Sequence, residues 1–179
     1  MSRFDAVRER NAAFAESGGH EDATIMPRLR IAVLTCLDPR VDPAVIFSLR
    51  LGDAAVLRNA GGRVTTAVVE DLAFIGQIAE AAAPEGPLFE VAVVHHTLCG
   101  TALLADESLR TRYAERIDTE PAALVARAVL DPEATVREDV ARLRASSAIP
   151  DRVAISGHVY DVQTGRVRTI VDTTVLAAV

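Results

Sequence analysis

Short apolar runs, separated by segments of helical periodicity, most constrain how this chain can fold. The runs are RIAVLTC (30–36), AAVLRN (54–59), LFEVAVVHH (88–96) and RVAISGHVYDV (152–162). The nearly continuous apolarity of the first run is typical of a parallel strand that is buried on both faces. A tight turn at Thr164-Gly165 leads into RVRTIVD (166–172), which we expect to be an antiparallel strand. Strands that alternate with helices predict an α/β fold with a mostly parallel central sheet of four parallel strands, an antiparallel C-terminal fifth strand and flanking helices.

The segments between the runs carry helix signals. Residues 66–82 are predicted to form a long helix, whose apolar face comprises Val68, Leu72, Ile75, Ala79 and Ala82. A short helix is expected over 42–49, with Asp42 as its N-cap and Pro43 as its first residue. Residues 100–130 are expected to be mainly helical. A further helix opens at Asp131-Pro132 and places Val136, Val140 and Leu143 on one face.

We expect one domain over residues 1–179, made of an N-terminal helical arm (1–22) and an α/β core (30–172). The arm would hold a helix over about residues 2–16, with a thin apolar stripe of Phe4, Val7 and Phe14. Packing on another subunit and a frayed terminus explain that stripe equally well.

Composition narrows the class of protein. The 179 residues carry a net charge of −6 and no block rich in lysine or arginine, so no electrostatic nucleic-acid partner is expected. No apolar stretch approaches the length of a membrane span, and the charged N-terminus lacks a signal-peptide core, so no membrane partner is expected. The chain is expected to be soluble and cytoplasmic. In a reducing cytosol, two cysteines favour metal binding or catalysis over a disulfide scaffold.

Both cysteines lie where predicted strands end. TCLDPR (35–40) supplies Cys36 and Asp38, and HHTLCG (95–100) supplies His96 and Cys99. Because sites in parallel sheets form at the carboxyl ends of strands, the two stretches are expected at one edge. Two thiolates and one imidazole suit tetrahedral zinc and leave a fourth position for water or for Asp38. Ordinary buried thiols, a disulfide and a closed structural zinc site remain open on this reasoning.

The chain resembles the β-class carbonic anhydrases. That family carries C-x-D-x-R after its first strand and H-x-x-C after its third, which here are Cys36, Asp38 and Arg40, then His96 and Cys99. The segments GDAAVLRNAGG (52–62) and GHVYDVQTGRV (157–167) are also similar, and the resemblance covers about residues 31–171. HHTLCG looks like the motif of a compact bacterial branch of the family.

The resemblance implies that Cys36, His96 and Cys99 bind one catalytic Zn²⁺ per subunit. It implies reversible hydration of CO2 to bicarbonate and a proton by zinc-bound hydroxide. It also implies a gate, in which Arg40 holds Asp38 away from zinc in the active form. In the closed resting form, Asp38 would itself be a zinc ligand. The family usually pairs subunits, so a homodimer or tetramer is expected.

Two other functions remain open: hydrolysis of carbonyl sulfide or carbon disulfide at the same site, and a non-catalytic zinc protein. Pro39 and Leu98 depart from the common family pattern, and Leu98 could make the pocket drier. His95 is expected on the opposite strand face from His96, either supporting the metal ligands from behind or in a structural role, and His158 is expected near the hairpin. The Gly61-Gly62 pair could either bind an anion through its N–H groups or form a close-packed turn.

Overall fold

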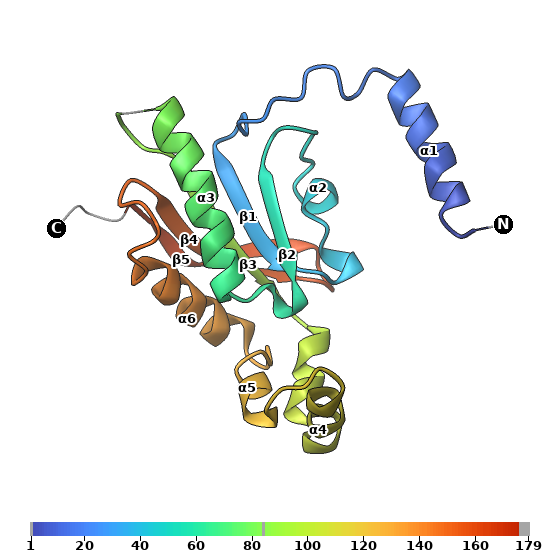
Figure 1. The fold of residues 1–179 in the computed structure, drawn as a ribbon, viewed down its shortest axis with the longest axis vertical. Coiled ribbons are helices and arrows are strands. Elements are labelled where there is room, and N and C mark those ends of the chain that lie inside the picture. The colour runs from blue at the N-terminus through green and yellow to red at the C-terminus, as the bar shows by residue number, and fades with distance from the viewer. Residues whose placement is uncertain (1, 84, 176–179) are drawn as a thin grey trace.

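A five-stranded sheet forms the centre of the computed structural model, which describes residues 2–83 and 85–175 (Figure 1). The strands lie in the order β2-β1-β3-β4-β5, and their bounds are β1 Ile31–Cys36, β2 Ala55–Asn59, β3 Glu90–His96, β4 Ala154–Asp161 and β5 Arg166–Val175. The first four pair in parallel, and β5 pairs with β4 in the antiparallel sense. The predicted fold class is confirmed, although β5 continues to Val175 where the sequence predicted an end at residue 172.

Two helices cover one face of the sheet. They are α3 (Thr66–Ala82) and α6 (Pro132–Arg144), whose apolar side chains join those of β1, β3 and β4 in one buried cluster (Figure 1). The caps are local: the Thr65 side chain accepts a hydrogen bond from the Val68 N–H, and the Asp131 side chain accepts from two N–H groups of the first turn of α6. The sequence located both helices closely, α3 from the spacing of its apolar residues and α6 from its Asp131-Pro132 start.

The buried face of α3 differs in part from the predicted one. Val68, Leu72 and Ala79 are buried as expected, whereas Ile75 is only partly buried and Ala82 is exposed. Gly76 is buried on this face instead, packed against Pro150. Only a glycine fits there, because a Cβ at this position would lie 2.9 Å from the Pro150 side chain. A close helix–loop approach of this kind leaves no trace in apolar periodicity.

The other helical segments are short. They are η1 Pro39–Val41, α2 Pro43–Ile46, η2 Ala60–Gly62, η3 Gly100–Ala105, α4 Glu107–Arg116 and α5 Pro121–Val125. The predicted helix over 42–49 is therefore shorter than expected, although Asp42 caps it as predicted. It ends early because Ser48 adopts a left-handed backbone with φ 52°. Helical structure over 100–130 is confirmed as three pieces.

The N-terminal helix α1 (Asp5–Glu16) lies apart from the sheet, at the end of a long connecting segment (Figure 1). None of its residues, all of which the structure describes, is buried. The stripe residues Phe4, Val7 and Phe14 are 67%, 51% and 42% exposed. Within the described residues, none of the helices is long and apolar enough to cross a membrane.

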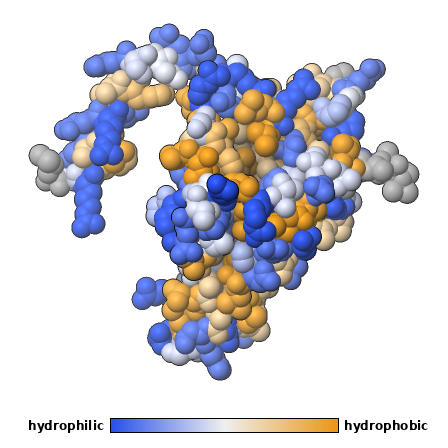
Figure 2. Space-filling model, turned by 180° about the vertical axis from the view of Figure 1, so that it is seen from behind, coloured by the Kyte–Doolittle hydropathy of each residue, from blue (hydrophilic) through white to orange (hydrophobic). Residues whose placement is uncertain are grey.

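The sheet face opposite α3 and α6 is incompletely covered. A cavity of about 260 Å³ opens there, lined by nine residues of β1, β3 and their surroundings: Leu29, Ile31, Val33, Phe47, Leu49, Ala92, Val94, His158 and Val167. Figure 2 views the molecule from behind Figure 1 and shows apolar side chains gathered on the body, beside the separate N-terminal arm. Each chain therefore carries both an exposed N-terminal helix and an apolar cavity on the uncovered face of its sheet.

Candidate metal centre

Cys36, His96 and Cys99 come together at one edge of the sheet. Cys36 is the last residue of β1, His96 is the last of the neighbouring parallel strand β3, and Cys99 follows three residues later. The three ligand atoms all lie within 4.8 Å of one another, and the two sulfurs are 3.9 Å apart. All three residues are buried. The expected meeting of the two motifs is therefore present in the tertiary structure.

The imidazole of His96 has the tautomer that metal binding needs. Its Nδ1 lies 2.9 Å from the Thr97 carbonyl oxygen, which can only accept, so Nδ1 carries the proton. Nε2 is buried and has no hydrogen-bond partner among the described residues. Leaving a buried polar nitrogen unpaired is costly, and a metal ion would use its lone pair. The donor set of two sulfurs and one imidazole fits zinc.

The two thiols share hydrogen bonds that favour one thiolate. The bond between the sulfurs raises the pKa of Cys36 to about 12 and lowers the pKa of Cys99 to about 6. Thr101 Oγ1 lies 3.1 Å from Cys99 Sγ, and the Gly61 N–H donates to Cys36 Sγ over 3.3 Å. The site therefore stabilises negative charge on the sulfur of Cys99, and the thiolate is the form of cysteine that binds metal.

Asp38 and Arg40 form a two-pronged ion pair beside the cluster. Arg40 Nε donates to Asp38 Oδ1 over 3.0 Å, and Nη2 donates to Oδ2 over 2.7 Å. The backbone N–H of Arg40 adds a third bond, of 2.9 Å. The Arg40 hydrogen bonds lower the pKa of the Asp38 carboxyl to about 2. Asp38 is not among the described residues whose ligand atoms form the 4.8 Å cluster.

Pro39 and Leu98 both shape this pair. Asp38 has the extended backbone (ψ 127°) that a following proline favours, and from there its side chain caps the short helix η1. Leu98 has a left-handed φ of 55°, and its carbonyl oxygen accepts a 3.0 Å bond from Arg40 Nη2. Arg40 therefore ties together the two loops that carry the cysteines. The Leu98 side chain, 63% exposed, lies beside them at the surface.

Arg58, in β2, is a residue that the sequence analysis missed. Its guanidinium donates to the carbonyl oxygens of Cys36 and Asp38, over 3.0 and 2.8 Å, and to the Asp42 carboxylate over 2.9 Å. These bonds fix the backbone of the C-x-D-x-R loop from a neighbouring strand. The available signal was an arginine inside the otherwise apolar run AAVLRN.

The Gly61-Gly62 pair forms a close-packed turn, one of its two expected forms. A Cβ on Gly62 would lie 2.8 Å from the Thr35 carbonyl carbon, and the φ of Gly62 is +66°. The Gly61 N–H does face negative charge, but that charge belongs to the sulfur of Cys36.

The two flagged histidines lie as predicted. His95 is fully buried, on the sheet face that packs on α6, where Nδ1 lies 2.8 Å from Thr135 Oγ1. His158 lies in the β4–β5 hairpin, bonded to Ser156 and Thr169. Burial lowers the pKa of His158.

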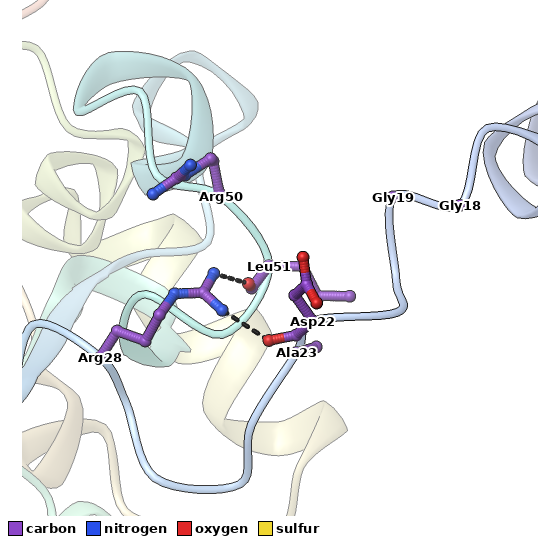
Figure 3. Close-up of a pocket in the computed structure, with 7 residues that line it drawn as sticks. All are labelled: Gly18, Gly19, Asp22, Ala23, Arg28, Arg50 and Leu51. Atoms are coloured by element: carbon purple, nitrogen blue, oxygen red, sulfur yellow. Dashed lines mark hydrogen bonds between the residues drawn. The ribbon is translucent and has the colours of Figure 1, made fainter.

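A polar pocket lies where the arm meets the body (Figure 3). It is lined by Gly18, Gly19, Asp22, Ala23, Arg28, Arg50 and Leu51. The Arg28 guanidinium donates to the carbonyl oxygens of Asp22 and Leu51, and its Nε donates to Asp53. The donors of Arg28 are thus used to hold the connecting segment, and the predicted site residues do not line this pocket.

Known proteins match the sequence and the fold. A family model described as carbonic anhydrase matches residues 31–167. The chain is 26% identical over 170 residues to beta-carbonic anhydrase 1 of Mycobacterium tuberculosis, covering 95% of this chain and 99% of that protein. It is 26% identical over 162 residues to a carbon disulfide hydrolase of Acidianus sp., covering 78% and 76%. The crystal structure of carbonic anhydrase from Streptococcus mutans superposes with a TM-score of 0.76 at 36% identity, covering 95% of this chain and 98% of that one. The chain therefore belongs to the β-class carbonic anhydrases and is an enzyme of that family.

Proposed function

We propose that this protein catalyses the reversible hydration of CO2 to bicarbonate and a proton, with one zinc ion per subunit. The observation that carries the proposal is the buried group of Cys36, His96 and Cys99, in which His96 Nε2 lacks a partner among the described residues. Since a reducing compartment keeps both thiols available, we also propose a cytoplasmic location.

Cys36, His96 and Cys99 would hold the zinc ion. Zinc with three protein ligands supplies Lewis-acid activation of water, which makes a nucleophile available near neutral pH. The chain's own part is to orient that water. Asp38 is ionised at neutral pH because its pKa is about 2, so it can accept a hydrogen bond from the water. Arg40 fixes the direction in which Asp38 accepts.

The same pair provides the proposed gate. With Arg40 engaged, the Asp38 carboxylate stays outside the ligand cluster. Released from Arg40, it would be free to turn towards the metal and occupy the fourth position in a closed form. Arg40 therefore decides between an acceptor role and a ligand role for Asp38.

Carbonyl sulfide or carbon disulfide is the second candidate substrate. Leu37 and Leu98 lie within the two site motifs and are 60% and 63% exposed, so apolar groups border the site. Linear, weakly polar molecules lose little hydration on such a surface. A relative of this chain also carries the name carbon disulfide hydrolase.

Zinc content and stopped-flow CO2 hydration from pH 6 to 9 test the proposal, with carbonyl sulfide and carbon disulfide assayed in parallel. We expect about one zinc per chain and CO2 hydration that is lost when zinc is removed. Zinc-loaded protein that is inert towards CO2 but hydrolyses a sulfur substrate would favour the second candidate. Inertness towards all three would contradict both.

We further propose that residues 1–179 act as a single domain whose arm (1–22) packs on a second copy, giving a dimer at least. A 12-residue helix with no buried residue is marginal in water, so α1 needs a surface to cover its apolar stripe. The apolar cavity opposite α3 and α6 offers one, because eight of its nine lining residues are apolar and His158 is the exception.

Light scattering at micromolar concentration tests the dimer. Val7→Asp puts a charge into the apolar stripe and is expected to weaken association by tenfold or more. Ala12→Asp adds the same charge on the other side of α1 and should leave association unchanged. Wild-type protein that is monomeric under these conditions would contradict the proposal.

A further inference from the structure

Three polar residues are buried behind the metal centre and have no part in the proposed chemistry. The side chains of His95 and Asp139 are 0% exposed, and that of Arg63 is 7% exposed. They come from different elements: His95 from β3, Asp139 from α6, and Arg63 from the residue after η2. Charged residues are almost never buried unless they are paired, so their contacts need an explanation.

Asp139 joins the other two side chains. Its Oδ2 lies 2.7 Å from Arg63 Nε and 3.2 Å from His95 Nε2, and its Oδ1 lies 3.3 Å from Arg63 Nη2. Burial acts to raise the pKa of the Asp139 carboxyl, but the His95 and Arg63 contacts outweigh it and leave the pKa lowered. Asp139 is therefore a buried carboxylate held between two donors.

This group reaches the metal site through the glycine turn. His95 Nε2 faces the Gly62 carbonyl oxygen at 3.2 Å as well as Asp139, and since both can only accept, Nε2 carries the proton. The turn is held from the other side by Asn59, which bonds the N–H and the carbonyl oxygen of Arg63 over 2.9 and 2.8 Å. The Gly61 N–H, in the same turn, donates to Cys36 Sγ.

A second connection runs along β3. His95 and His96 are neighbours on opposite faces of the strand, and Thr135 of α6 anchors the other nitrogen of His95 at 2.8 Å. Fixing His95 on one face fixes the backbone that aims His96 from the other. The buried group of Arg63, Asp139 and His95 is thus connected to two of the three metal-binding side chains. It reaches Cys36 through the glycine turn, and it reaches His96 through the backbone of β3.

We propose that Arg63, Asp139 and His95 are positioning residues of the zinc site, which hold the Gly61-Gly62 turn against the Cys36 sulfur and fix the end of β3. Burying an ion pair contributes little net stability compared with apolar packing, so stability alone is a weak reason for this arrangement. Partners behind metal ligands typically change metal affinity by about 10- to 100-fold. The inference rests on the proposed zinc function.

Zinc affinity, measured by competition with a chelator at pH 7.5, tests the inference on the full chain. Asp139→Asn removes the charge and keeps the shape, and it is expected to weaken zinc binding by about 10- to 100-fold. Asp53→Asn is the matched control. Asp53 is also a buried carboxylate, paired with Arg28 over 3.0 Å, but it lies just before β2, at the opposite end of the parallel strands. The control should lower stability and leave zinc affinity within about twofold.

Cobalt substitution gives a second readout. If the turn loosens, the N–H bond to Cys36 Sγ is lost, and electron density stays on the sulfur. The thiolate-to-cobalt charge-transfer band of Asp139→Asn is then expected at longer wavelength, and that of Asp53→Asn at the wild-type position. Loss of stability alone would move neither band.

Thr135→Val decides the question if Asp139→Asn does not fold. It is nearly isosteric and removes the hydroxyl that contacts His95 Nδ1 and that also donates to the Asp131 carbonyl oxygen over 3.0 Å. We expect zinc binding at least threefold weaker. Wild-type zinc affinity in every folded variant would overturn the inference while leaving the proposed function intact. Wild-type protein that binds no zinc would instead overturn the proposed function.

Discussion

Replacing Arg40 by glutamine should separate catalysis from folding. Arg40→Gln removes the two side-chain bonds to Asp38, of 3.0 and 2.7 Å, and the 3.0 Å bond to the Leu98 carbonyl oxygen. The 2.9 Å bond from the residue-40 backbone N–H to Asp38 remains. Asp38 therefore keeps its place in the chain but loses the group that holds its carboxylate away from the cluster.

The size of the effect follows from the pKa of Asp38. The carboxyl titrates at about 2 where 3.8 is ordinary, which corresponds to a factor of about 60 in affinity for a proton. A freed carboxylate would regain at most a comparable factor in affinity for a competing metal ion. Because the Arg40 side chain is 49% exposed and screened by water, a factor of about ten is the better expectation. We expect kcat/KM for CO2 hydration to fall about tenfold with zinc still bound.

The assay is stopped-flow CO2 hydration at pH 8, with zinc content and thermal unfolding measured on the same samples. Arg168→Gln is the matched control, because Arg168 also makes a 2.7 Å ion pair, with Glu133, and lies in β5, two strands beyond β3 in the sheet order. The control should retain full activity, and both variants should unfold within about 3 °C of wild type. Unchanged activity in zinc-loaded Arg40→Gln would refute the reasoning, and lost zinc would show that Arg40 acts through metal binding instead.

Three further predictions follow from the same contacts. Because the pKa of Asp38 is lowered, its pair with Arg40 stabilises the fold fully above pH 3.8 and progressively less as the pH falls to about 2. In urea titrations, the free energies of unfolding of wild type and Arg40→Gln should therefore differ by a constant amount from pH 5 to 8 and converge below pH 4. Gly62→Ala should lower the free energy of unfolding in urea more than Gly165→Ala does. Each substitution forces an alanine into the left-handed region, at about 1–2 kcal/mol. Only at Gly62 does the new Cβ also meet backbone, because it would lie 2.8 Å from the Thr35 carbonyl carbon. Equal losses would contradict the close-packed turn. Removing zinc with a chelator should lower the unfolding temperature by about 5–10 °C in calorimetry, because a ligand at a hundred times its Kd stabilises by about 2.7 kcal/mol; an unchanged temperature would argue against a bound metal.

The sequence by itself determined the strands, the long helices and the candidate site residues. The side chains of Asp42 and Asp131 cap their helices by accepting hydrogen bonds from N–H groups two or three residues further along the chain. The apolar runs alternate with segments of helical periodicity. Both signals depend only on residues that are close in sequence. The two cysteine motifs could be placed at one edge because neighbouring parallel strands end there. That Cys36, His96 and Cys99 bind zinc stays a prediction.

Only the tertiary structure decided how the site is held. Arg58 reaches the loop at Cys36 across 22 residues of sequence, and Arg63 meets Asp139 across 76. It also decided that Asp38 pairs with Arg40 outside the cluster, and that Gly76, not Ala82, lies against the rest of the protein. Helix periods and caps depend on residues a few positions apart, and so they are written in a single sequence. Which buried charges meet depends on how distant elements pack, because a charge removed from water is stable only beside a partner that the fold itself supplies.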